Sequence, residues 1–144
     1  MSDVAFHFGA PDKLAYACRL LRKATASGSQ VVVWVSDADC AQLDADLWAV
    51  GPTDFVSHCT ATAPDAMRQR SAVELCSSWD EVAASNAGIL VNLAHGFPTG
   101  FERFPRVIEV VSVDEDDRAA ARDRWKRYTA QGVAIQRHDL NLRK

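Results

Sequence analysis

Three short apolar runs constrain the fold of this chain more than any other feature. They are Val31–Val35, Gly88–Leu93 and Arg106–Val111, and the last is broken only by Glu109. None of the three alternates regularly between polar and apolar residues, so both faces of each strand must be covered. This pattern is typical of central strands in a parallel sheet that has helices on both faces.

Segments before, between and after these runs predict helices. Lys13–Ala26 repeats apolar residues at helical spacing and is followed by a Ser-Gly pair. A second helix is expected from Asp37, as its N-cap, to Trp48. Asp114–Ala130 has acids in its first turn, bases in its later turns and Gly132 after its end, which favours a third helix.

Shorter strands complete the predicted sheet. They are expected at Val4–Phe8, Phe55–Cys59, Val73–Leu75 and Val133–Arg137, the last as an edge strand, with an irregular loop between the second and third. Because strands and helices alternate, the sequence predicts a three-layer α/β/α fold with a mostly parallel, Rossmann-like sheet. The 144 residues are expected to form a single domain, residues 1–144.

Composition excludes several classes of protein. The chain has 16 Lys and Arg residues against 19 Asp and Glu residues, a net charge of −3, so direct nucleic-acid binding is not expected. No apolar run approaches the ~20 residues that cross a bilayer, and residues 1–4 lack the features of a signal peptide. We therefore expect a cytoplasmic protein without membrane contact, monomeric when isolated.

The cysteines and histidines do not form a metal-binding pattern. They are scattered without a pair at metal-ligand spacing: Cys18, Cys40, Cys59, Cys76, His7, His58, His95 and His138. Reduced thiols in a reducing compartment fit this distribution. No structural metal and no cofactor are expected.

An enzyme or small nucleotide-binding protein is the alternative interpretation of this fold class. The loop after the first strand contains only Gly9, so it lacks the glycine-rich sequence that binds a pyrophosphate. Asp37 could imitate a ribose-binding acid, and His95 with the Gly96–Gly100 loop could bind an anion. Glu109 could be a buried acid with a perturbed pKa, or it could instead face a basic side chain or lie near an edge of the sheet. Helix capping and loop turns are the simpler explanations of the first two features. No catalytic residue is predicted.

The strongest local signal is a cluster of basic residues in the last predicted helix. Between Arg118 and Arg127 lie five basic residues and one acid. Helical spacing gives a stripe toward the sheet and an adjoining basic stripe: Ala121, Trp125 and Tyr128, then Arg118, Arg122 and Lys126. Trp125 lies on the border, where one ring face could meet a ligand. The cluster fits either a partner that combines carboxylates with an aromatic group or a solvated basic face.

Ordered motifs along nearly the whole chain point to a family. They are the aromatic first strand, Ala45–Trp48, Phe55–His58, Ile89–Leu93, Phe104–Val111 and Ala121–Tyr128. In this order and spacing they resemble the chi subunit of bacterial DNA polymerase III. The resemblance implies a non-catalytic accessory protein of the clamp-loader assembly in DNA replication, with a nucleotide-binding-like fold but no nucleotide.

The resemblance also implies two binding surfaces. Chi subunits recognise the acidic, phenylalanine-terminated C-terminal tail of single-strand DNA-binding protein, and the matching residues here are Val111, Arg118, Arg122, Trp125 and Lys126. Arg122 and Lys126 would meet the carboxylates of the tail, and Trp125 and Val111 its apolar end.

The second surface is the one through which the family contacts the psi subunit. It would fall on Trp48, Phe55 and Val56, although Ser57 replaces a proline of the family's pattern. In similar chi proteins the same surface is associated with a helicase, so psi and a helicase are both candidate partners. The sequence alone also allows these large apolar residues to belong to the core.

Overall fold

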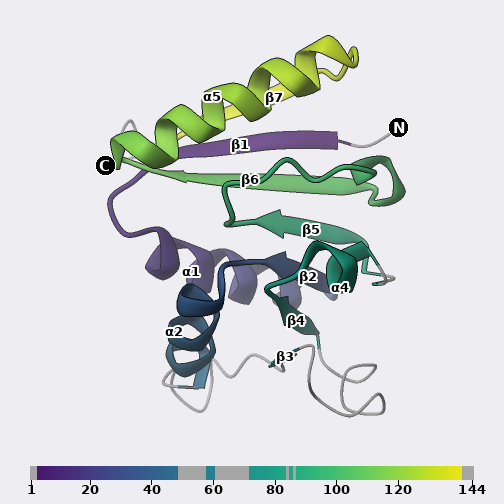
Figure 1. Ribbon diagram of the computed structural model, residues 1–144. Helices are drawn as coiled ribbons and strands as arrows, with labels where there is room; N and C mark the ends of the chain where they lie inside the picture. Colours follow the sequence, from purple (N-terminus) through teal and green to yellow (C-terminus); the bar gives the residue numbers. More distant parts are fainter. Residues whose placement is uncertain (1–2, 49–57, 61–71, 84, 86, 141–144) are drawn as a thin grey trace.

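The described residues form one sheet of seven parallel strands between two layers of helices (Figure 1). The computed structural model describes residues 3–48, 58–60, 72–83, 85 and 87–140. The strand order is β3-β4-β2-β5-β6-β1-β7, and each strand runs parallel to its neighbours. The predicted three-layer α/β fold with a Rossmann-like sheet is therefore confirmed.

The bounds of the elements are as follows. The strands are β1 (Asp3–Ala10), β2 (Val31–Trp34), β3 (His58–Thr60), β4 (Val73–Cys76), β5 (Ile89–Asn92), β6 (Arg106–Ser112) and β7 (Ile135–Asp139). The helices are α1 (Lys13–Ala26), α2 (Asp37–Trp48), α4 (Trp79–Ala83) and α5 (Glu115–Ala130), with the 3₁₀ helix η2 (Phe101–Arg103). Among these described helices, none is long and apolar enough to span a bilayer.

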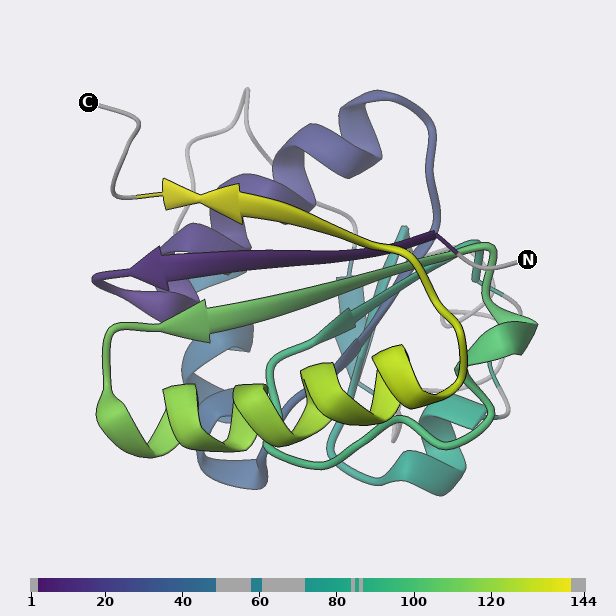
Figure 2. The same cartoon turned by 90° about the horizontal axis from the view of Figure 1, so that it is seen from above.

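The helices divide between the two faces of the sheet. α1 and α2 pack with Val31 and Val33 of β2 in one apolar cluster, whereas α4, η2 and α5 pack with Val32 in the other. Figure 2 shows α1 and α5 on opposite sides of β1, β6 and β7. Successive residues of β2 enter opposite cores, which explains why the run Val31–Val35 is apolar at every position.

The helices on the first face agree with the sequence, with one correction. α1 has the predicted bounds, and the Asp12 carboxylate accepts a hydrogen bond from the Ala15 amide at 3.1 Å. α2 also runs as predicted, but Asp37 is its first residue, so its prediction as the N-cap is wrong. Ser36 caps the helix instead, because its hydroxyl oxygen accepts from the Asp39 amide at 3.3 Å.

The last strand begins later than its sequence pattern predicts. β7 starts at Ile135 instead of Val133. The Val133 amide donates to the Tyr128 carbonyl at 3.1 Å, so this residue takes part in capping the end of α5 and does not pair with β1. Gly132 has a φ of 80°, a left-handed conformation that ends the helix and turns the chain back along the sheet.

The middle of the chain departs most from the prediction. β3 is His58–Thr60, and residues 55–57 of the predicted strand lie outside the described part of the chain. The helices α4 and η2 were not predicted from the sequence. They have five and three residues, too few to show a helical period.

Candidate functional site

A cavity lies between α5 and the strands β1, β6 and β7. Its volume is about 470 Å³, and residues from all four elements line it: Phe6, Phe8, Val111, Arg118, Ala121, Arg122, Trp125, Lys126 and Arg137. All five residues that the sequence analysis placed in one binding surface are among them. The structure thus brings together the predicted residues of α5 and β6, and adds a wall from β1 and β7.

The wall of the cavity against the sheet is apolar. Phe6 and Phe8 of β1 are two residues apart, so both point to the face that α5 covers, and Val111 of β6 pairs with Phe8. Phe6 and Val111 are buried, and Trp125 of α5 is half-buried against them. The Phe6 and Trp125 rings meet edge to face with centroids 5.0 Å apart. The predicted border position of Trp125 is confirmed.

The outer side of the cavity is basic. Arg118 and Arg122 have side chains 56% and 57% exposed, and Lys126 is also exposed one turn further along α5. Both arginines contact Glu115 of the first helical turn: Arg122 Nη2 lies 3.0 Å and Arg118 Nη1 3.7 Å from its carboxylate oxygens. The hydrogen bond from Arg122 lowers the pKa of Glu115. The carboxylate of Glu115, in the same helix, therefore pairs with two cations of the site, Arg118 and Arg122.

Arg124 belongs to the cluster of basic residues in α5, but it is buried and does not lie on the exposed basic side of the helix. The residue is 1% exposed, and its Nε donates to Glu109 Oε1 at 2.9 Å in the interior. The buried residues of α5 are Asp117, Ala121, Arg124 and Tyr128. The face of α5 toward the sheet is thus centred near Arg124, and Trp125 lies at its edge.

The buried carboxylate of Glu109 is the centre of a hydrogen-bond network. Besides Arg124, it accepts from the Tyr128 hydroxyl at 2.7 Å and from Asn92 Nδ2 at 3.1 Å. Arg124 Nη1 also donates to the His95 carbonyl at 3.1 Å. Burial raises the pKa of Glu109, and the Arg124 guanidinium opposes that shift. Glu109 is thus a buried acid, as one of the alternatives from the sequence held, and it also faces a basic side chain, as another held. Its partners join α5 to β5 and β6.

The residues of the alternative, enzyme-like site do not gather in one place. A second cavity at the carboxyl ends of β2, β5 and β6 includes His95, but Asp37 and the glycines of the 96–100 loop do not line it. A Cβ atom at Gly96 would lie 2.6 Å from the Trp34 ring, and Gly100 has a φ of 86°. Packing and backbone conformation therefore account for these two glycines.

Asp117 is the best-connected group of that second cavity. Its carboxylate accepts from Lys13 Nζ at 2.9 Å and from the Ser112 amide at 2.7 Å, and His95 Nε2 lies 3.1 Å away. Burial would raise the pKa of Asp117, but the hydrogen bonds from Ser112 and Lys13 outweigh it and hold the pKa below its usual value. These contacts tie the start of α5 to the start of α1.

Some of the remaining residues named from the sequence lie within the described part of the chain and others do not. Cys18 and Cys76 are buried free thiols, and Cys40 is a half-buried one. In the described part of the chain, no group of His, Cys, Asp and Glu residues could hold a metal ion. Phe55 and Val56 lie outside the described residues, as does the side chain of Trp48 at the end of α2.

Comparison with known proteins identifies the family. The family model for the DNA polymerase III chi subunit, HolC, matches residues 1–136. The chain belongs to the chi family. A chi subunit of DNA polymerase III from Pseudomonas aeruginosa is 31% identical over 129 residues, covering 89% of this chain and 87% of that protein. The chi subunit from Haemophilus influenzae is 28% identical over 118 residues, covering 81% and 79%. The predicted chi-family membership is confirmed.

Four cavity residues were not among the five site residues predicted for this chi-family chain: Phe6, Phe8, Ala121 and Arg137. Ala121 was expected only to face the sheet. Phe6, Phe8 and Arg137 belong to strands, whereas the basic and aromatic signal was sought on the last helix. The i, i+2 spacing of the two phenylalanines already placed both on one face of the first strand. The position of Arg137 depended on the pairing of β1 with β7, which sets Phe6 opposite Arg137 and could not be read from either segment alone.

Proposed function

We propose that this chi-family chain is a non-catalytic accessory subunit that tethers the clamp-loader assembly of DNA polymerase III to the acidic C-terminal tail of single-strand DNA-binding protein. One observation carries the proposal: Val111, Arg118, Arg122, Trp125 and Lys126 line a single cavity that has an apolar wall and a basic rim. The acidic residues and the terminal phenylalanine of such a tail have the complementary chemistry.

Recognition in this proposal needs no chemical step. Arg122 and Lys126 form charge-assisted hydrogen bonds with carboxylates of the tail, and the terminal ring loses water against Phe6, Val111 and Trp125. A short peptide held by these contacts is expected to bind with a Kd on the order of micromolar. Because the rim is exposed, affinity should fall as the salt concentration rises.

Replacing Arg122 with Ala is expected to weaken tail binding by ~1–3 kcal/mol, because a carboxylate loses its charged donor. Fluorescence anisotropy with a labelled acidic peptide ending in Pro-Phe measures the affinity. A peptide without the final Phe provides the ligand control, and it should bind far more weakly. If wild type fails to bind the complete peptide, or if Arg122→Ala binds it normally, tail recognition at this cavity is wrong.

Replacing Glu115 with Gln is expected to strengthen binding of the same peptide about two- to fivefold. Glu115 is paired with Arg122 at 3.0 Å and Arg118 at 3.7 Å, so tail carboxylates must compete with it for these cations. Asp116→Asn is the matched control, since it removes an equal charge from an exposed neighbour that forms no ion pair with a described residue. Equal gains in both variants would show that only net charge matters.

The psi subunit, or a helicase in its place, is proposed to bind a second surface containing Trp48, Phe55 and Val56. The proposal is supported by the family membership and by the two matching motifs around these residues. Trp48→Ala should then abolish co-purification with psi, or with the helicase, while affinity for the tail peptide stays unchanged. Loss of tail binding in this variant would contradict two separate surfaces.

A further inference from the structure

We infer that Arg137 of β7 binds the C-terminal carboxylate of an acidic peptide whose last side chain is aromatic. This makes the cavity selective for the end of a chain over an internal segment. The inference rests on the proposed function and assigns a ligand group to a residue outside the five predicted from the sequence.

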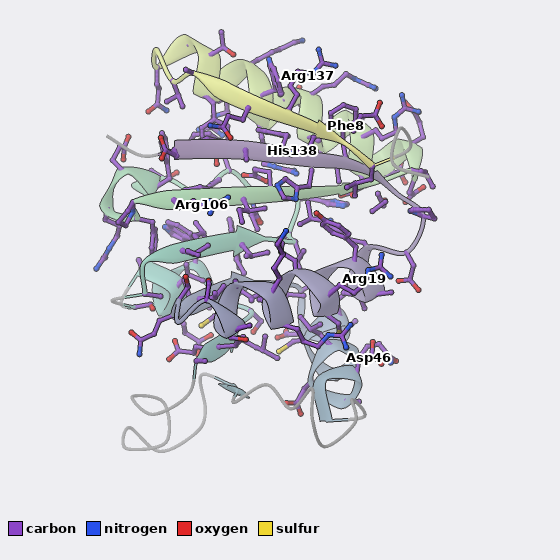
Figure 3. The ribbon with its side chains drawn as sticks, turned by 180° about the vertical axis from the view of Figure 1, so that it is seen from behind. Phe8, Arg19, Asp46, Arg106, Arg137 and His138 are labelled. Carbon is purple, nitrogen blue, oxygen red and sulfur yellow. The ribbon has the colours of Figure 1, made fainter. Side chains whose placement is uncertain are left out.

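Arg137 lies against the apolar wall of the cavity. Its Cζ is 5.4 Å from the centre of the Phe8 ring and 5.8 Å from the centre of the Trp125 ring. Figure 3 shows Arg137 and Phe8 together on the neighbouring strands β7 and β1. The two cation–π contacts hold the guanidinium where the apolar wall meets solvent, although the residue itself is exposed.

Arg137 is also available for an anion. Arg118 and Arg122 are engaged with Glu115, whereas no described carboxylate lies within ion-pair distance of Arg137. Lys126 is likewise unpaired among the described residues, but an ammonium group acts as a point charge. A guanidinium can donate two parallel hydrogen bonds to one carboxylate, the geometry best suited to a terminal carboxylate group.

The geometry of a terminal aromatic residue connects these observations. Its α-carboxylate is joined to the ring through only two carbon atoms, so the carboxylate must stay within a few ångströms of the ring. A ring seated against Phe6, Val111 and Trp125 therefore brings the terminal carboxylate to the edge where Arg137 lies. Acidic side chains earlier in the peptide remain for Arg122 and Lys126. An internal Phe would bring a neutral amide to Arg137 instead.

The test compares two peptides on three proteins by anisotropy. The peptides share an acidic sequence ending in Phe, one with a free carboxylate and the other with a C-terminal amide. The proteins are wild type, Arg137→Gln and Arg106→Gln. Arg106 is the matched control because it is an exposed arginine at the other end of β6, five residues before Val111, and it does not line the cavity.

Wild type and Arg106→Gln are expected to prefer the free carboxylate about tenfold, and Arg137→Gln to lose most of that preference. The ratio between peptides cancels any general loss of affinity caused by disturbing the Trp125 ring. If Arg137→Gln keeps the preference, or if wild type binds both peptides equally, the inference is overturned and the tail receptor stands. If wild type binds neither peptide, the proposed function itself fails.

Discussion

Replacing Arg124 with Met is expected to lower the free energy of unfolding by about 3–5 kcal/mol, because it removes one partner of a fully buried ion pair. Arg124 is 1% exposed and Glu109 is 0% exposed, and Arg124 Nε lies 2.9 Å from Glu109 Oε1. The methionine fills similar space, so the main cost is the carboxylate left without its cation. The lost hydrogen bond to the His95 carbonyl adds to this cost.

The pH dependence of this variant identifies the cause. Burial raises the pKa of Glu109, and the substitution removes the guanidinium that opposes the shift. A carboxyl group whose pKa is higher in the folded state binds a proton there that the unfolded chain has lost. Stability of the variant relative to wild type therefore decreases as pH rises from the ordinary carboxyl pKa toward the raised one. The deficit should be larger at pH 8 than at pH 5.

Urea unfolding at these two pH values measures the effect. The double variant Glu109→Gln with Arg124→Met should be more stable at pH 8 than Arg124→Met alone, since Gln still accepts from Tyr128 without a charge. Arg118→Met, on the exposed side of the same helix, should change stability by less than about 0.5 kcal/mol. An equal deficit at both pH values would show that lost packing, and not an uncompensated carboxylate, explains the loss.

Arg124 also shows where prediction from the sequence ends. In the sequence it is one of five basic residues within ten positions, and nothing local separates it from Arg122. The difference arises from tertiary structure, because only Arg124 faces Glu109 on β6 once α5 lies on the sheet. The acid itself was noticeable because it interrupts an apolar run. Its partner could be identified only from the packing.

The elements themselves were more predictable because their signals are local. The run Val31–Val35 predicted a strand covered on both faces, and the periodicity of Lys13–Ala26 gave the bounds of α1. The five-residue helix α4 lacks such a signal, since its packing depends on residues distant in the sequence. The basic stripe of α5 with Trp125 on its border was likewise a local signal, whereas Val111 was named only through the resemblance to chi subunits and Arg137 was not named as a site residue.

Replacing Trp125 with Ala is expected to weaken the tail peptide about 30-fold or more, or ~2 kcal/mol, the effect typical of a central aromatic residue in an interface. Trp125 is half-buried, lines the cavity from α5 and contacts Phe6 edge to face at 5.0 Å. It is also one of the two rings beneath the Arg137 guanidinium. Removing the Trp125 ring enlarges the cavity and takes away one of the two rings that hold the Arg137 guanidinium.

The substitution also removes packing from the core, so binding must be separated from stability. Trp79→Ala is the matched control, because Trp79 is a half-buried tryptophan of the same apolar cluster that packs on Trp34 at 5.0 Å and does not line the cavity. Both variants should lose stability in urea unfolding, and only Trp125→Ala should lose the peptide.

Trp125→Phe provides the second comparison, since it keeps an aromatic ring in the wall and should bind with intermediate affinity. Anisotropy titrations are made at a temperature where urea unfolding shows every variant to be folded. If Trp125→Ala binds like wild type, the ring does not contact the ligand and the cavity is not the receptor. If Trp79→Ala loses the peptide to the same extent, the effect reflects the stability of this core layer and gives no support to a site on α5.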